Sequence, residues 1–101
     1  MNPMQQMVMQ MQKAQRELQK AQAELAAKEF ETNKAGLVQI KVNGNKEILS
    51  IDIEEDGFEP DNKEMIQDLI KDGLNELFVK IDEEYAKIEE KIAGKTGGLG
   101  F

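Results

Sequence analysis

The chain has 101 residues, with 13 Lys and Arg against 20 Asp and Glu, and therefore a formal net charge of -7 at pH 7. This length fits one domain, residues 1–101, and the acidic balance at first sight disfavours a nucleic-acid partner. Because Cys and His are both absent, disulfides, zinc–thiolate sites and the usual general base near neutral pH are excluded.

A long helix is predicted over residues 4–29, within an N-terminal arm of residues 1–29. Its apolar residues follow the alternating three- and four-residue spacing of a coiled-coil seam. About 26 residues span roughly 39 Å, more than the roughly 30–35 Å diameter of a compact chain of this size. The helix is therefore expected to project or to lie along a partner. The dimer or packing seam is assigned to Met4, Met7, Met11, Leu18 and Leu25.

A three-stranded antiparallel meander is predicted over residues 30–53. Its strands are a short one at Phe30–Thr32, one over 37–42, and one over 47–53. Alternation places Val38, Ile40 and Val42 on one face of the second strand and Leu49, Ile51 and Ile53 on one face of the third. Asn43-Gly44 predicts a tight hairpin turn with positive φ at both residues.

A second helix is predicted within residues 61–93, with Asp61 as its N-cap and Glu64 three residues later. Gly73 lies on its apolar face, which predicts the close approach of another element. Residues 94–101 are expected to form a flexible tail. The resulting class is α+β with the order α-β-β-β-α. Because both helices outrun the small sheet, we expect a homodimer with projecting helical arms. The apolar stripe of the second helix is Ile66, Leu69, Ile70, Leu74, Leu77, Ile81, Tyr85, Ile88 and Ile92.

The sequence predicts no enzyme: no catalytic residues, no cofactor, no metal and no small-molecule substrate. The acidic group around Asp52–Asp56 lacks the ligand spacing of a calcium loop. Ser50 has no histidine to activate it as a nucleophile. There is no run of about 18 apolar residues, so no membrane contact is expected. The start of the chain also lacks the basic residues of a signal peptide, and the expected location is the cytoplasm.

Charge is distributed unevenly along the chain. Residues 1–35 hold five basic and four acidic residues, whereas residues 36–101 hold eight basic and sixteen acidic ones. Lys13, Arg16 and Lys20 are spaced so that they share one helical face. They are either a stripe that contacts phosphates or an ordinary solvated face, and the residues alone favour the second interpretation.

Several strings resemble the YbaB/EbfC family of bacterial nucleoid-associated proteins. They are Gly36-Leu37-Val38, Asn43-Gly44, Ile51-Asp52-Ile53, and the segment 61–69 with Asn75, together with the Met- and Gln-rich first helix. The resemblance implies a dimer whose helical arms grip double-stranded DNA with little sequence preference, in the nucleoid. The arm residues it implies for backbone contacts are Lys13, Arg16, Lys20, Lys28 and Lys91, and less directly Lys87 and Lys95.

Our first hypothesis is therefore a non-enzymatic, homodimeric DNA-binding protein of the nucleoid. The alternative is a dimeric protein–protein interaction module that docks another cytoplasmic protein through its Met-rich helix. A weaker third option is RNA binding. An unpaired Met4, Met11 and Leu18 stripe in the dimer favours protein docking, whereas a stripe of Lys and Arg that faces an open cleft about one duplex wide favours DNA.

Overall fold

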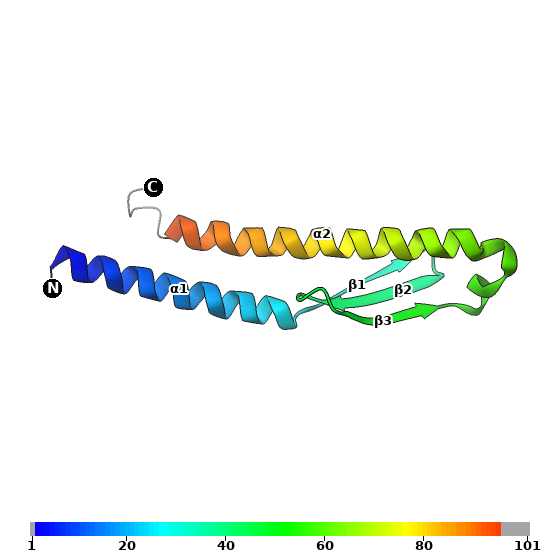
Figure 1. Cartoon of the computed structure of the whole chain (residues 1–101), viewed down its shortest axis with the longest axis horizontal. Helices are drawn as coiled ribbons and strands as arrows, with labels where there is room; N and C mark the ends of the chain where they lie inside the picture. The colour runs from blue at the N-terminus through cyan, green and yellow to red at the C-terminus, as the bar shows by residue number, and fades with distance from the viewer. Residues whose placement is uncertain (1, 96–101) are drawn as a thin grey trace.

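The structure, a computed structural model, describes residues 2–95. Its elements are two helices, three strands and two short 3-10 turns, so the predicted α+β class and the α-β-β-β-α order are confirmed (Figure 1). In chain order they are α1 (Pro3–Ala27), β1 (Glu29–Lys34), β2 (Val38–Asn43), β3 (Ile48–Ile53), η1 (Glu55–Phe58), η2 (Pro60–Asn62) and α2 (Lys63–Lys95).

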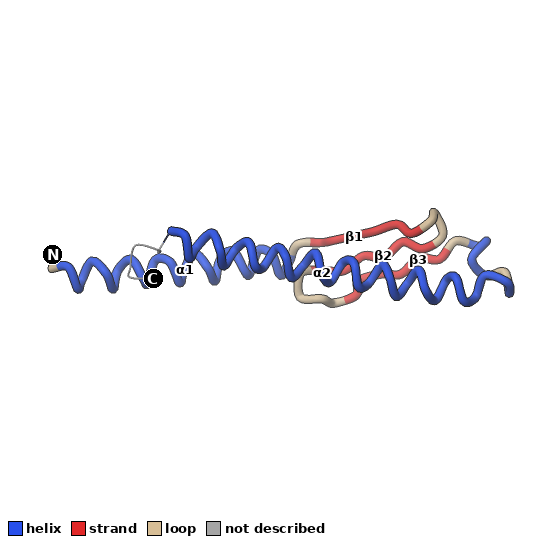
Figure 2. Tube along the Cα trace, turned by 90° about the horizontal axis from the view of Figure 1, so that it is seen from above, coloured by secondary structure: helices blue, strands red, loops and turns tan. Residues whose placement is uncertain are grey.

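The molecule is a rod rather than a sphere. Its principal extents are 72 × 21 × 14 Å. The radius of gyration is 20.2 Å, against about 13 Å for a compact chain of this length. Figures 1 and 2 show the cause: α1 and α2 run antiparallel as two arms, and the sheet packs only against the N-terminal half of α2. The sheet and the arm tips therefore lie at opposite ends.

Local chemistry explains where α1 begins and ends. The Asn2 side chain accepts a hydrogen bond from the Gln5 amide at 2.7 Å, and Pro3 occupies the first turn. Lys28 is extended, with φ -70° and ψ 139°, and its carbonyl accepts a hydrogen bond from the Gly44 amide at 3.0 Å. The chain is thereby drawn into the sheet, and the helix ends two residues before the expected position 29.

The second hairpin differs from its prediction. Positive φ was expected at Asn43 and Gly44, but in this hairpin it occurs at Lys46, with φ 64°. The expected turn is present, since the Lys46 amide donates to the Asn43 carbonyl at 2.9 Å, but the predicted positive φ at Asn43 and Gly44 is wrong. The Asn43 side-chain oxygen accepts hydrogen bonds from the Asn45 and Glu47 amides at 2.9 and 3.1 Å. These bonds stabilise a longer loop, and the extra length is absorbed as a bulge in the β2–β3 pairing.

The core lies between the sheet and α2. The strands follow the antiparallel order β1-β2-β3. Val38, Ile40 and Val42 are buried against α2, which confirms the predicted inner face of β2. Gly73 lets the sheet approach, since a Cβ there would lie 2.8 Å from the Ile40 Cδ1 atom; the predicted close approach is confirmed. The buried core consists of Leu25, Phe30, Val38, Ile40, Val42, Ile66, Leu77 and Ile81.

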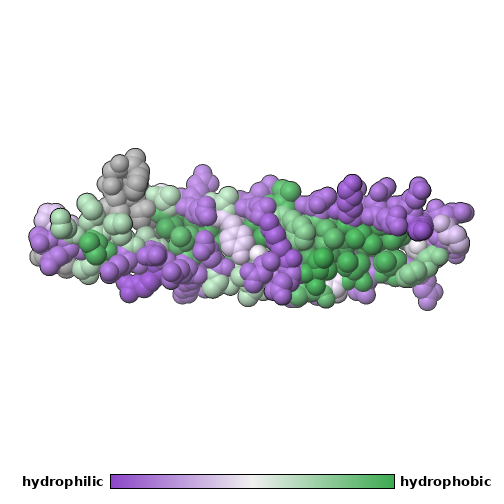
Figure 3. Space-filling model, in the orientation of Figure 1, coloured by the Kyte–Doolittle hydropathy of each residue, from purple (hydrophilic) through white to green (hydrophobic). Residues whose placement is uncertain are grey.

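The third strand is left largely uncovered, because α2 packs on β1 and β2. The register places Ile51 beside Ile40 and Ile53 beside Val38, but the bulge puts Ile48, rather than the expected Leu49, beside Val42. Ile48 and Ile51 are 49% and 40% exposed. Figure 3 shows a continuous hydrophobic area over the sheet half of the molecule.

The end of α2 extends past its expected limit. The tail predicted over 94–101 begins inside the helix, since Gly94 and Lys95 are both helical. Residues 96–101 lie outside the described part of the chain. Helix α2 begins at Lys63, two residues after the expected N-cap Asp61, which lies in η2.

Candidate nucleic-acid interface

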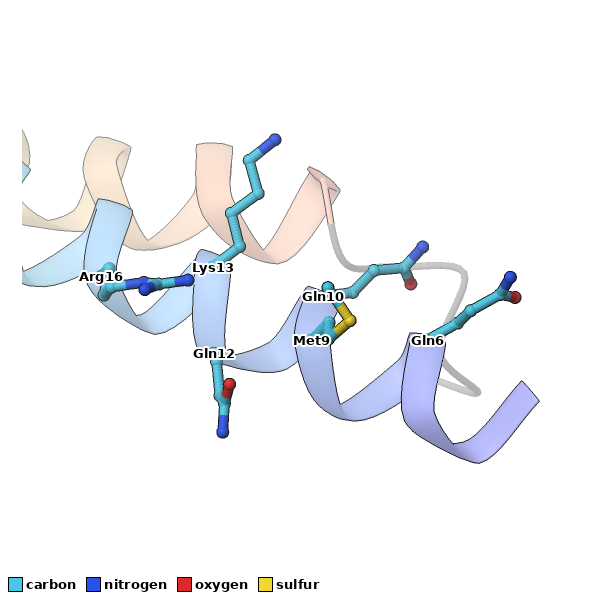
Figure 4. Close-up of a pocket in the computed structure, with 6 residues that line it drawn as sticks. All are labelled: Gln6, Met9, Gln10, Gln12, Lys13 and Arg16. Atoms are coloured by element: carbon cyan, nitrogen blue, oxygen red, sulfur yellow. The ribbon is translucent and has the colours of Figure 1, made fainter. Parts of the chain in front are cut away.

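The basic residues of α1 form the first part of the candidate site. Lys13, Arg16 and Lys20 are all exposed. Lys13 and Arg16 border one shallow depression in the outer half of α1, together with glutamines and Met9. Figure 4 shows the Lys13 and Gln12 side chains extending to different sides of the helix, so this surface is open rather than an enclosed pocket. Such a surface suits an extended polyanion better than a small ligand.

Lys20 belongs to a second group, which spans both arms. It borders a depression between α1 and α2 together with Lys91, and Glu17 and Glu24 border the same depression. The apolar floor includes Ile88 of α2. The structure therefore brings Lys20 and Lys91 together, but with two carboxylates beside them. The local charges nearly cancel here, whereas Lys13 and Arg16 share their depression with neutral residues.

The other predicted bases lie apart from these two groups. The Lys28 ammonium is 5.1 Å from the centre of the Phe30 ring, a cation–π contact at the base of α1. The Lys87 ammonium lies 3.8 Å from a Glu84 carboxylate oxygen on the same helix. Nothing is described of the Lys95 side chain. The basic residues thus follow the arms as separate clusters rather than as one patch.

The strongest acidic segment lies at the opposite end of the rod. Residues 54–68 contain seven acidic residues and one basic residue, and they occupy η1, η2 and the first turns of α2. The outer part of α1, residues 3–20, contains three basic residues and one acidic residue. The fold therefore separates charge along its long axis. The uneven distribution of charge along the chain is visible in the sequence. The position of the two segments at opposite ends of the folded molecule is not.

Within residues 2–95, no group of three or more His, Cys, Asp or Glu side chains is arranged to hold a metal ion. Neither described helix is long and apolar enough to cross a membrane. The chemistry that the arms do offer is ion pairing with phosphates from lysine and arginine, and hydrogen bonding from the neighbouring glutamines.

Paired helical arms on a three-stranded sheet, with exposed bases on the arms and an acidic opposite end, define a class of small, elongated α+β protein with an open candidate interface. The chain belongs to the YbaB/EbfC DNA-binding family, whose profile matches residues 1–98.

Bacterial relatives agree with this family. The chain is 45% identical over its whole length to a nucleoid-associated protein of Clostridium novyi, of which it covers 81%. It is 40% identical over 73% of its length to a nucleoid-associated protein of Mycoplasmopsis pulmonis, of which it covers 71%. It is 38% identical over 97% of its length to a nucleoid-associated protein of Alkaliphilus metalliredigens, covering 84% of that protein.

Proposed function

We propose that the chain is a non-enzymatic, homodimeric, nucleoid-associated protein of the bacterial cytoplasm that binds double-stranded DNA through phosphate contacts. Membership of a DNA-binding family supports the choice of DNA, and the names of the relatives support its place in the nucleoid. The contacts are assigned mainly to Lys13, Arg16 and Lys20, which share one face of α1. Lys28 and Lys91 have a smaller share, because Lys28 contacts Phe30 and Lys91 lies on the more acidic helix α2.

The observation that carries this proposal is the position of the exposed bases of α1 at the end of the rod away from the acidic segment. Electrostatic screening at physiological salt acts over about 8 Å, whereas the long axis of the molecule measures 72 Å. The acidic end therefore does little to repel a duplex held at the arms. The net charge of -7 acts at long range and slows association, which predicts modest affinity.

The same contacts account for little sequence preference. Lysine and arginine that bind phosphates set the position of a protein on the duplex and carry no direct sequence information. Binding of this kind depends strongly on salt, because each contact releases a counterion. If a dimer uses three bases in each protomer, six contacts predict a loss of roughly 10³-fold in affinity between 50 and 200 mM salt. A salt titration in a gel-shift assay measures this slope.

The assignment is tested by replacing Lys13, Arg16 and Lys20 together with Gln. We expect the slope of log affinity against log salt to become shallower, from roughly -5 towards zero. The melting temperature is expected to change little. The matched control replaces Lys63, Lys71 and Lys80, which are also exposed and change the net charge by the same amount. If both triple variants weaken binding equally, net charge rather than the α1 site controls binding, and the assignment is wrong.

A second candidate function, protein docking through the Met-rich helix, is favoured by the exposure of Met4, Met7 and Met11. The two functions separate in one experiment. If the chain is a docking module, the unchanged protein shows no affinity for duplex DNA. The variant with the three α1 bases replaced by Gln still binds the protein partner. Competition between DNA and RNA in the same gel-shift assay tests the RNA option.

A further inference from the structure

The outermost part of α1 extends beyond the described end of α2 in both views of the chain (Figures 1 and 2). We call residues 3–13 of this helix the α1 tip. Its seam residues are exposed: Met4 by 74%, Met7 by 46% and Met11 by 55%. Leu25, at the other end of the same seam, is 6% exposed. The seam is thus buried at Leu25, half-buried at Leu18 and exposed beyond the described end of α2.

The α1 tip continues an interface that is already formed. Helix α1 contacts α2, and Ala21 of the seam borders the same depression as Ile88 and Ile92 of α2, so the inner half of the seam lies beside a helix. The three- and four-residue spacing runs unbroken from Leu18 out to Met4. A seam with this spacing is shaped to receive side chains of a second helix. The inner half of α1 has α2 as its neighbour. The α1 tip is therefore expected to pack against another helix in the corresponding position.

The charge of the α1 tip indicates which helix fits. Residues 2–12 contain no charged side chain, and glutamines flank the methionines. A strongly charged partner helix gains no ion pair there. A membrane surface is also a poor match, because interfacial helices use Lys and Arg on the polar face and large aromatic or Leu anchors. A neutral, amphipathic, Met-lined helix fits best, and a second copy of the same tip has this chemistry.

We propose that the α1 tip pairs with the α1 tip of a second molecule, methionine seam to methionine seam, and thereby links dimers to one another. The pairing is antiparallel. Parallel pairing would place Lys13 beside Lys13, whereas antiparallel pairing centred near Met7 places the two lysines at opposite ends of the contact. This inference goes beyond the proposed function, because it uses only the exposed seam and not the DNA contacts.

The size of the contact determines its strength. Eleven residues make about three helical turns, so a single pair of tips forms a weak contact between free dimers. Dimers held close together on DNA have a high effective concentration of tips, and the contact then strengthens without any new interaction. Linked dimers would connect separate stretches of duplex.

Disulfide trapping tests the contact, because the chain has no Cys and a single introduced Cys reports one position. Met7→Cys lies on the seam, and the control Gln12→Cys lies roughly 140° around the helix. Under mild oxidation without DNA, we expect Met7→Cys to form disulfide-linked chains several-fold faster than Gln12→Cys, across a series of protein concentrations. Light scattering is expected to show that the linked species are tetramers or larger. Equal rates, or a linked species no larger than a dimer, would overturn the proposal.

A second variant checks the result without oxidation. Replacing Met4, Met7 and Met11 together with Gln is expected to abolish the concentration-dependent association above the dimer in sedimentation, with an unchanged melting temperature. Association that survives this change would also overturn the proposal. Because neither experiment contains DNA, its failure is distinguishable from a failure of DNA binding, which the gel-shift assay measures separately.

Discussion

At the scale of single residues, Gly44 joins the three parts of the molecule. Its amide donates to the Lys28 carbonyl at 3.0 Å, and its carbonyl accepts a hydrogen bond from the Tyr85 hydroxyl at 3.1 Å. A Cβ at this position would lie 1.8 Å from the Leu25 carbonyl oxygen. The backbone of α1 therefore rests directly on the hairpin. Gly44 is required here for its small size and not for a positive φ.

Gly44→Ala is expected to destabilise the fold, because a methyl group cannot fit without moving the end of α1 or the hairpin. Overpacking of this kind costs about 1–3 kcal/mol, and each kcal/mol lowers the melting temperature of a domain of this size by roughly 4–8 °C. Thermal unfolding followed by circular dichroism, at fixed protein concentration, measures the change.

Gly94→Ala is the matched control for this substitution. Nothing lies within 4 Å of a Cβ built there, and the residue is in a helix, where Ala is favoured over Gly by about 1 kcal/mol. The control is expected to leave the melting temperature unchanged or raise it. A Gly44→Ala protein as stable as the Gly94→Ala protein would contradict the contact between α1 and the hairpin.

At the scale of secondary-structure elements, α1 depends on α2 along only part of its length. Isolated helices are marginal in water, and most helical stability in proteins comes from packing. Leu25 is buried and Leu18 is half-buried, whereas the α1 tip has its seam exposed. The arm is therefore expected to be most stable near the sheet and to lose stability towards its N-terminus.

Ile88→Lys tests this gradient, because Ile88 borders the depression between the arms together with Ala21. We expect the amides of residues 17–24 of α1, which border the same depression as Ile88, to exchange hydrogen at least tenfold faster, while the amides of β2 keep their protection. Hydrogen exchange resolved by residue measures both. Ala86→Lys, at an exposed position of α2, is the control, and equal effects from the two variants would show that Ile88 does not support α1.

At the scale of the whole molecule, the surface is larger than the chain length requires. The chain exposes 7447 Å², against about 5,800 Å² for a compact protein of its mass. The surplus, about 1,700 Å², includes the open face of β3, where Ile48 and Ile51 are exposed. A protomer contributes about 800 Å² to an interface of standard size. This face is therefore a candidate for the contact of the proposed homodimer.

Ile48→Glu combined with Ile51→Glu is expected to convert the dimer to a monomer, because the burial of two carboxylates in an apolar contact is strongly unfavourable. Sedimentation equilibrium measures the mass. The salt dependence of DNA binding should fall by about half in parallel, since a monomer has half the phosphate contacts. Val79→Glu is the control, as Val79 is exposed on α2. A double variant that stays dimeric would place the interface elsewhere.

Much of the fold follows from local patterns. Periodic apolar residues predict both helices, and alternation predicts β2 with Val38, Ile40 and Val42 inward. The β2–β3 hairpin shows what local patterns do not predict. The Asn43-Gly44 pair predicts a turn type, but the contacts of Gly44 with Leu25 and Tyr85 depend on segments at least 19 residues away in the chain. Local rules therefore found the turn and missed the role of its glycine.

The candidate site divides in the same way. The sequence by itself determined the elements, their order, the helical face shared by the α1 bases, and the resemblance to a DNA-binding family, because these depend on residue types at short spacing. Only the tertiary structure decided that Lys20 and Lys91 border one depression between the arms, that the acidic segment lies at the far end of the rod, and that the methionine seam and β3 remain open. Each of these features arises because the two helices are much longer than the sheet. Which residues stay exposed as a result is decided only by how the helices and the sheet pack in the folded chain.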